Sequence, residues 1–507
     1  METSNTQPGA NDNSTAAPKP VAETKPLDPT LTNEKGEETK ASINGAEETK
    51  VIEIGEKEMS MGAEVYNSTG ASLGSSIINM MNTIVGAGTL SLPCTIMDGG
   101  IVGAGLLLIL SLALSLFGAH YLVVASAYTN EDSYGFIGRK LVNKGTGYFA
   151  DFFMILFDFG ICVGYCNIVF SQTTDLVHNV FHIDENTLDS HNWWIYLLET
   201  VLLLFPMLSL PTIDALRWTS SIAIVCIVLF VVISIIVGVR QVIIQPLEYN
   251  WFPQTIGAFS TAVSVFFTCL ASHVNIPKMT AELKLPKASK FSSRVKKMDR
   301  ANNVAFVACS LIYYLVGLCG YLAYGPNTED NLLTNFGTNN TWYMNIVKLA
   351  YSFVALFSYP VLAFSPLVSI DKTLFKQPRP ATRRVLQAFI WSILTYVVAM
   401  IIPQLRVIFS LTGSLCGVAL VFVWPAFFYI HVAKREKARA KSTKRSQYDI
   451  KTGAIYFAWF LFYIGIVMAV FMTALEVKKL VAPSVDPTIP PTLSPTFMPS
   501  VTPTAAP

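Results

Sequence analysis

The sequence predicts an all-α integral membrane protein with about eleven transmembrane helices. The 507 residues are 52% hydrophobic and only 14% charged, whereas soluble proteins carry roughly a quarter charged residues. Apolar stretches long enough to cross a bilayer recur from residue 72 to residue 476. This pattern excludes a soluble enzyme and a single-pass receptor, and it gives no support to nucleic-acid binding.

Windows of about 20 apolar residues define the individual spans. They cover residues 72–97, 99–127, 148–177, 193–210, 218–239, 255–277, 302–325, 342–370, 385–403, 405–431 and 454–476. With the N-terminus in the cytosol, the cytosolic loops contain 25 lysine and arginine residues and the opposite side contains four. This asymmetry is the one that the positive-inside rule requires.

Both ends of the chain differ in composition from the membrane domain, residues 71–476. Residues 1–70 are rich in Glu, Thr, Asn, Lys and Pro, which predicts a disordered cytosolic tail. Residues 477–507 are rich in Pro, Ser and Thr and lie on the non-cytosolic side if there are eleven spans. Such a segment suits either an O-glycosylated stalk or an inert linker.

The first span contains the sequence VGAG, with Gly86 and Gly88, followed by Pro93. These residues interrupt a regular helix, and irregular backbone at membrane depth requires protein or a water-filled cavity around it. An unwound segment would offer amide groups to a carboxylate, and its carbonyls with Asn82 and Thr83 could coordinate a cation. Close helix packing through small residues is the alternative explanation.

The sixth span carries Ser272, His273 and Asn275 just before Pro277. Polar groups at this depth usually face a cavity or the interior of a helix bundle. We therefore expect His273 and Asn275 at or near a binding site, although a lone histidine also serves as a structural residue.

The two interrupted spans are five spans apart. This arrangement indicates an inverted-repeat secondary transporter with its site near the middle of the membrane. The repeats would cover residues 72–239 and 255–431, and residues 454–476 would form an accessory helix.

Several motifs resemble the amino acid/auxin permease family, which includes sodium-coupled neutral amino acid transporters and vacuolar amino acid transporters. They are NTIVGAGTLSLP followed by GG, SHVNIPKMTAEL with His273, Asn275 and Glu282, and GYLAYG followed by DNLLTNF. The resemblance extends over roughly residues 70–476. It implies a leucine-transporter-like fold with five-plus-five repeats, and amino acid transport coupled to an ion gradient.

The resemblance also implies roles for particular residues. The substrate carboxylate would contact the backbone of Val85, Gly86, Ala87, Gly88 and Thr89. The substrate side chain would contact Tyr165 and the segment from Phe266 to Ser272. Asn82 and Ser358 match positions that sodium-coupled relatives use near their ion, and only sodium coupling would give this chain a metal site.

Five ionisable residues lie inside apolar segments, namely Asp151, Asp158, Asp175, Glu199 and Lys348. Three of the acids lie near the ends of their spans and can reach the interface. Asp158 is ten residues into its helix, about 15 Å deep, where an acidic group is a functional candidate by default. It would exchange a coupling proton or form a structural pair, for example with Lys348.

These observations predict a secondary active transporter of neutral amino acids that works by alternating access. The partners would be an amino acid, H⁺ or Na⁺, and the lipid bilayer of a vacuole, another endomembrane or the plasma membrane. We expect no enzymatic activity and no cofactor, because the cytosolic segments show no nucleophile–base pair and no phosphate-binding loop. An amino-acid sensor on the same fold is the first alternative, and a channel is the second.

Overall fold

The computed structural model describes residues 70–181, 185–210, 217–244, 248–285, 291–338, 342–375, 379–443 and 450–481. The chain divides into two units, Met1–Ser60 and Met61–Pro507, and every described residue belongs to the second unit. Apart from residue 70 and residues 477–481, both predicted tails lie outside the described residues.

The described part of the chain is helical, with one isolated bridge between Ala71 and Leu283. Nine of its helices are long and apolar enough to cross a membrane, and a bent pair, Leu73–Ile84 with Gly88–Gly99, forms a tenth span. The predicted fourth span corresponds to a shorter apolar helix, Asn192–Leu208. The all-α membrane fold class is therefore confirmed.

The first span is broken where the glycines predict it. Helix α2 (Leu73–Ile84) ends at Val85, and a 3-10 turn, η1 (Ala87–Ser91), leads into α3 (Leu92–Gly99). Gly86 lies between them with φ −138° and ψ −148°. The helix axis bends by 53° between the two halves.

The remaining spans of the first repeat are continuous helices apart from the fourth. They are α4 (Ile101–Thr129), α6 (Lys144–Phe181) and α9 (Arg217–Ile244), with a short helix α5 (Tyr134–Leu141) between α4 and α6. The fourth span consists of α7 (Glu185–Glu199), a π-helical turn η2 (Thr200–Leu204) and α8 (Phe205–Leu208).

The sixth span is also broken, but earlier than the proline suggests. Helix α10 (Ile256–Leu270) ends at Ala271, and η4 (Ser272–Asn275) connects it to α11 (Ile276–Glu282). Pro277 lies in the first turn of α11, where a missing amide hydrogen costs nothing. Pro277 therefore begins the second half-helix and does not break the first.

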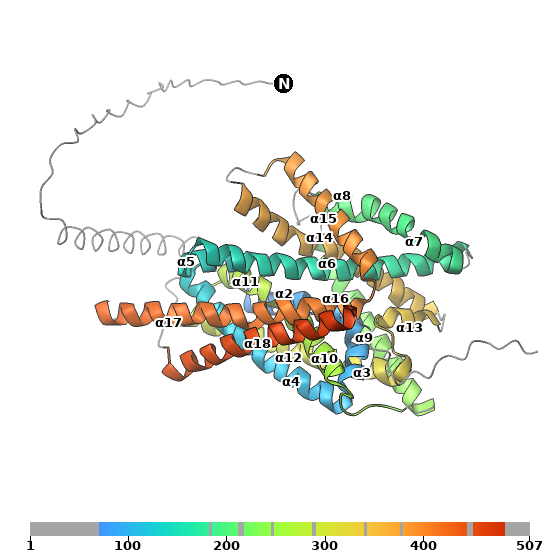
Figure 1. The fold of residues 1–507 in the computed structure, drawn as a ribbon, viewed down its shortest axis with the longest axis horizontal. Coiled ribbons are helices and arrows are strands. Elements are labelled where there is room, and N and C mark those ends of the chain that lie inside the picture. Colours follow the sequence, from blue (N-terminus) through green and yellow to red (C-terminus); the bar gives the residue numbers. More distant parts are fainter. Residues whose placement is uncertain are drawn as a thin grey trace, which may run out of the picture. The chain divides into compact units, whose positions relative to one another are not determined.

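The rest of the second repeat begins with α12 (Phe291–Tyr324), η5 (Gly325–Asn327), α13 (Leu332–Thr338), α14 (Trp342–Leu374) and α15 (Ala381–Ile401). The tenth span consists of α16 (Leu405–Thr412), the π-helical turns η6 (Gly413–Gly417) and η7 (Ala419–Val423), and α17 (Trp424–Thr443). The accessory helix α18 (Thr452–Val481) follows and lies beside α17 (Figure 1).

Close helix contacts through small residues hold the bundle together. Gly118 of α4 lies against the main chain of η7, where a Cβ atom would stand 1.7 Å from the carbonyl oxygen of Val421. Because lipid tails are as apolar as leucine, such backbone approaches provide the packing that a hydrophobic effect cannot provide in a membrane. Helix α6 packs on α14, and α12 packs on both α9 and α4.

Candidate functional site

A cavity of about 490 Å³ is bounded by both broken spans and by helices α6 and α14. Nine of the predicted site residues line it: Asn82, Val85, Gly86, Gly88, Asp158, Tyr165, Ser272, Asn275 and Ser358. These residues come from four spans that are far apart in the sequence. The structure thus brings the predicted substrate and ion positions together in one place.

The backbone at the first break has amide groups without partners. The amides of Val85 and Thr89 donate to the carbonyls of Met81 and Gly86, at 2.9 and 3.1 Å. Among the described residues, the amides of Gly86 and Gly88 donate no hydrogen bond. Both glycines line the cavity, so these two donors are available to an anionic group placed there.

Tyrosine hydroxyls fix the carbonyl groups of the same segment. Tyr351 of α14 donates to the carbonyl oxygen of Gly86 at 2.8 Å. Tyr313 of α12 donates to the carbonyl oxygen of Ile84 and, at 3.3 Å, to that of Cys269 in α10. A carbonyl freed by the break is thereby satisfied from neighbouring helices, as backbone inside a membrane requires.

The two glycines also pack closely, as the alternative explanation of the VGAG sequence requires. A Cβ atom on Gly86 would stand 2.8 Å from the hydroxyl of Tyr165, and one on Gly88 would stand 2.5 Å from the sulfur of Cys269. The first break therefore lies directly against α6 and α10. Small residues are required here for packing as well as for access to the backbone.

At the second break, the residues with polar side chains divide between two environments. Ser272 and Asn275 line the cavity. His273 is fully buried away from it, with Nε2 2.9 Å from the carbonyl oxygen of Ser115 and its ring edge-on to Phe306. His273 thus joins η4 to α4 and is not among the cavity-lining residues.

Two other predicted residues do not have side chains that line the cavity. Phe266 and Thr89 are fully buried and are absent from the cavity lining. Ala87 begins η1 between the two glycines, where its main chain continues the first break.

Asp158 does not form an ion pair with Lys348, which was the structural alternative to proton exchange. Lys348 of α14 forms an ion pair with Asp175, its Nζ lying 2.5 Å from Oδ2. Asp158 is 1% exposed and lines the cavity, and its Oδ2 atom has no hydrogen-bond partner among the described residues. The structure therefore leaves Asp158 facing the cavity without Lys348.

The other two acids also differ from the expectation that they reach the interface. Asp151 is 3% exposed and accepts a hydrogen bond from Arg139 of α5 at 2.9 Å. Glu199 is 8% exposed and accepts one from Thr173 at 2.7 Å. One oxygen of each carboxylate thus has a partner on a neighbouring helix, whereas Oδ1 of Asp151 and Oε2 of Glu199 are buried without a hydrogen-bond partner among the described residues.

The cavity extends from the breaks to residues of the predicted cytosolic loops. Asp132, Ser133 and Arg139, from the region of α5, line it together with Lys278 of α11 and Lys372 of α14. These residues could not be selected from the sequence, because they lie outside the apolar windows. Their presence in the lining indicates that the cavity leads toward the side that carries most of the cations.

Comparison with known proteins identifies the family. The model of the family described as transmembrane amino acid transporter protein matches residues 69–473. The chain belongs to this family. The match includes both broken spans and α18 as far as residue 473.

Individual relatives within the family are distant. The chain is 25% identical to amino acid transporter AVT6E of Arabidopsis thaliana over 390 residues, which is 73% of this chain and 78% of that one. It is 24% identical to sodium-coupled neutral amino acid symporter 2 of Danio rerio over 407 residues, which is 74% of this chain and 78% of that one.

A solved structure has the same fold. The manganese transporter of Eremococcus coleocola superposes with a TM-score of 0.53 over 82% of this chain and 88% of that one, at 12% sequence identity. The fold of this multi-pass transporter-family protein is therefore leucine-transporter-like.

Proposed function

We propose that this chain is a secondary active transporter that carries amino acids across a membrane by alternating access. One observation carries the proposal: a single cavity is bounded by both broken spans and contains the unpaired amides of Gly86 and Gly88. Two amides beside the N-terminal end of the following helices suit the carboxylate that every amino acid shares.

The substrate class follows from the rest of the lining. Val85 and Thr89 continue the backbone site on either side of the glycines, while Tyr165, Ser272 and Asn275 provide uncharged polar groups near it. We propose neutral amino acids, in agreement with the name of the Danio rerio symporter.

For the coupling ion we propose a proton carried by Asp158. A carboxylate buried without a partner is costly, so this group requires a proton or a bound cation in the closed protein. Its position in the same cavity as the substrate amides lets its protonation depend on whether substrate is bound.

Sodium is the alternative ion, and one specific observation favours it. Asn82 of α2 and Ser358 of α14 both line the cavity, and side-chain oxygens of this kind suit a hard cation. Two relatives from Danio rerio are named sodium-coupled transporters.

The decisive experiment measures uptake of radiolabelled amino acids into proteoliposomes while sodium and proton gradients are imposed separately. A transporter accumulates substrate against its concentration with one of the gradients. Binding without movement would show a sensor, and unsaturable flux without accumulation would show a channel. Either outcome would contradict the proposal.

We further propose that the N-terminus is cytosolic and that the protein resides in a vacuolar or other endomembrane or in the plasma membrane. The support is the distribution of lysine and arginine between alternate loops.

A further inference from the structure

Two tyrosine hydroxyls reach the main chain of the first break from other helices. Tyr351 of α14 donates to the carbonyl oxygen of Gly86 at 2.8 Å. Tyr313 of α12 donates to the carbonyl oxygen of Ile84. Both side chains are at most 1% exposed, and neither is among the described residues that line the cavity. The hydroxyls therefore approach the break from within the bundle and not from the cavity.

The two acceptors lie on either side of one peptide group. The carbonyl of Ile84 belongs to the peptide that ends at Val85, and the carbonyl of Gly86 belongs to the peptide that ends at Ala87. Between them, the peptide that joins Val85 to Gly86 carries the free amide of Gly86. Because each peptide is planar, this middle group turns only through the dihedral angles at Val85 and Gly86. Hydrogen bonds to both neighbouring peptides therefore fix the direction of the Gly86 amide.

Gly86 requires such support from outside its own segment. A Cβ atom at this position would stand 2.8 Å from the hydroxyl of Tyr165, so the close packing against α6 requires a glycine. Glycine, however, restricts its own backbone less than any other residue does. The observed φ of −138° and ψ of −148° are held by neighbouring groups, and the hydroxyls of Tyr313 and Tyr351 are placed to hold them.

Tyr313 also places the first break relative to the second. Its hydroxyl lies 3.3 Å from the carbonyl oxygen of Cys269, near the end of α10. Because a tyrosine hydroxyl has one proton, it donates to one of its two carbonyl neighbours at a time while it stays close to both. Cys269, Ser272 and Asn275 line the same cavity as Gly86. One side chain thus keeps the first halves of both broken spans together at the cavity.

We propose that Tyr313 and Tyr351 are positioning residues that direct the Gly86 amide toward the carboxylate of the substrate. A donor that is held in place before binding raises affinity, because the ligand does not have to order it. The two hydroxyls thereby favour ligands that have a carboxylate, without touching the ligand. This inference rests on the proposed function, which places the substrate carboxylate at Gly86 and Gly88.

The test compares ligands with and without a carboxylate. The probes are L-alanine, L-serine and L-leucine, together with the primary amide of each, in which an uncharged group replaces the carboxylate. Dissociation constants are measured on the purified wild type and on Tyr351→Phe and Tyr313→Phe. We expect each variant to bind the amino acids about fivefold more weakly, because the binding-competent direction of the amide is less populated.

The amides should lose less affinity than the amino acids in these variants. A hydrogen bond to a charged acceptor is about twice as strong as one to a neutral acceptor, so the carboxylate depends more on a well-directed donor. The ratio of the dissociation constant of each amide to that of its amino acid should therefore fall in both variants.

Tyr314→Phe is the matched control. Tyr314 is the next residue of α12, and its hydroxyl donates to the carbonyl oxygen of Ile101, at the start of α4, at 3.1 Å. This variant loses an equivalent hydrogen bond away from the break. We expect it to keep the wild-type ratio.

Two results would overturn the inference. One is an unchanged ratio in Tyr351→Phe and Tyr313→Phe, since a merely structural loss weakens both kinds of ligand alike. The other is an equal fall of the ratio in Tyr314→Phe. The proposed function fails separately, if the wild type binds none of the three amino acids.

Discussion

At the scale of single residues, Gly88 controls how closely the first broken span lies to α10. We expect Gly88→Val to abolish uptake while the protein still inserts in the membrane. A Cβ atom would stand 2.5 Å from the Cys269 sulfur, and the branched side chain would cover an amide that the substrate needs. Uptake in proteoliposomes measures the effect, and resistance of the protein to alkaline carbonate extraction checks insertion.

The matched control for this prediction is Gly74→Val in α2, where a Cβ atom meets nothing within 4 Å. It should transport normally, because the added side chain meets no neighbouring atom. The pair Gly88→Ala with Cys269→Ala relieves the clash, so restored uptake would assign Gly88 to packing alone. Normal uptake by Gly88→Val itself would refute the backbone site.

Asp158 gives the second prediction. If this residue carries the coupling proton, wild-type uptake at fixed membrane potential should rise as the substrate-loading side is acidified. Asp158→Asn cannot exchange a proton, so it should lose this pH dependence and the ability to accumulate substrate, while it retains exchange.

The control for Asp158 is the pair Asn82→Ala and Ser358→Ala, which should keep the pH dependence. Accumulation that requires sodium in the wild type and persists in Asp158→Asn would instead assign the ion site to Asn82 and Ser358. The measurement is the initial uptake rate across a pH series with and without sodium.

Residue types and their spacing predicted much of this site, because breaking residues and polar groups stand out in apolar spans. Gly86, Gly88, Ser272 and Asn275 all line the cavity as expected. The direction of a single side chain could not be predicted in the same way. His273 points to Ser115 because rotation within one turn of η4 decides which neighbour it meets.

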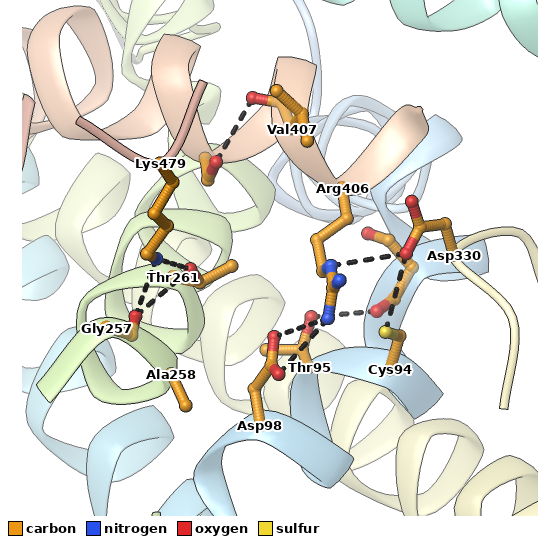
Figure 2. Close-up of polar contacts among 12 residues, drawn as sticks. Cys94, Thr95, Asp98, Gly257, Ala258, Thr261, Asp330, Arg406, Val407 and Lys479 are labelled. Carbon is orange, nitrogen blue, oxygen red and sulfur yellow. Dashed lines mark hydrogen bonds and ion pairs between the residues drawn. The ribbon is translucent and has the colours of Figure 1, made fainter. Parts of the chain in front are cut away.

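At the scale of helices, the buried carboxylate of Glu476 links α18 to α10 and α16. The carboxylate of Glu476 accepts hydrogen bonds from Thr261 of α10 at 3.1 Å and from Ser410 of α16 at 3.0 Å. The Nζ atom of Lys479 lies 2.9 Å from Oε1 of Glu476. The same ammonium group donates hydrogen bonds to the carbonyl oxygen of Gly257, at 2.7 Å, and to the hydroxyl of Thr261 (Figure 2). The accessory helix thus contacts α16 and one half of the second broken span.

We expect Glu476→Gln to lower the free energy of unfolding by about 2 kcal/mol, because an amide replaces charged hydrogen bonds at a site that is 5% exposed. The midpoint of thermal unfolding in detergent measures this loss. Lys478→Gln, at an exposed neighbouring position, should leave the midpoint unchanged. An unchanged midpoint in Glu476→Gln would show that these contacts do not hold α18.

Contacts between segments that are distant in the sequence explain which features of the helices could not be predicted from the sequence. The spans and both breaks follow from local composition, since apolar length and glycine or proline act within a few residues. The π-helical turns at Gly413–Gly417 and Ala419–Val423 depend instead on packing against other spans. The pairing of Lys348 with Asp175 is also non-local, and nothing in either segment specifies it.

At the scale of the whole molecule, the distribution of charge determines orientation. The side with 25 lysine and arginine residues in its loops also supplies Arg139, Lys278 and Lys372 to the cavity lining. Arg406 is one of only four cations on the other side in the sequence count. By the positive-inside rule, we propose that the cavity leads to the cytosol.

This orientation gives the final prediction. With eleven spans, the loop between α17 and α18 is cytosolic and the Pro-rich tail after α18 lies on the opposite side. An epitope placed after Pro507 should be reached by antibody from outside intact cells, or by protease from the lumen of sealed vesicles. An epitope inserted after Ser446 serves as the control and should be protected under the same conditions. If the terminal epitope were found in the cytosol, the number of spans would be even. One apolar segment would then fail to cross the membrane, and the short fourth span, Asn192–Leu208, would be the first candidate.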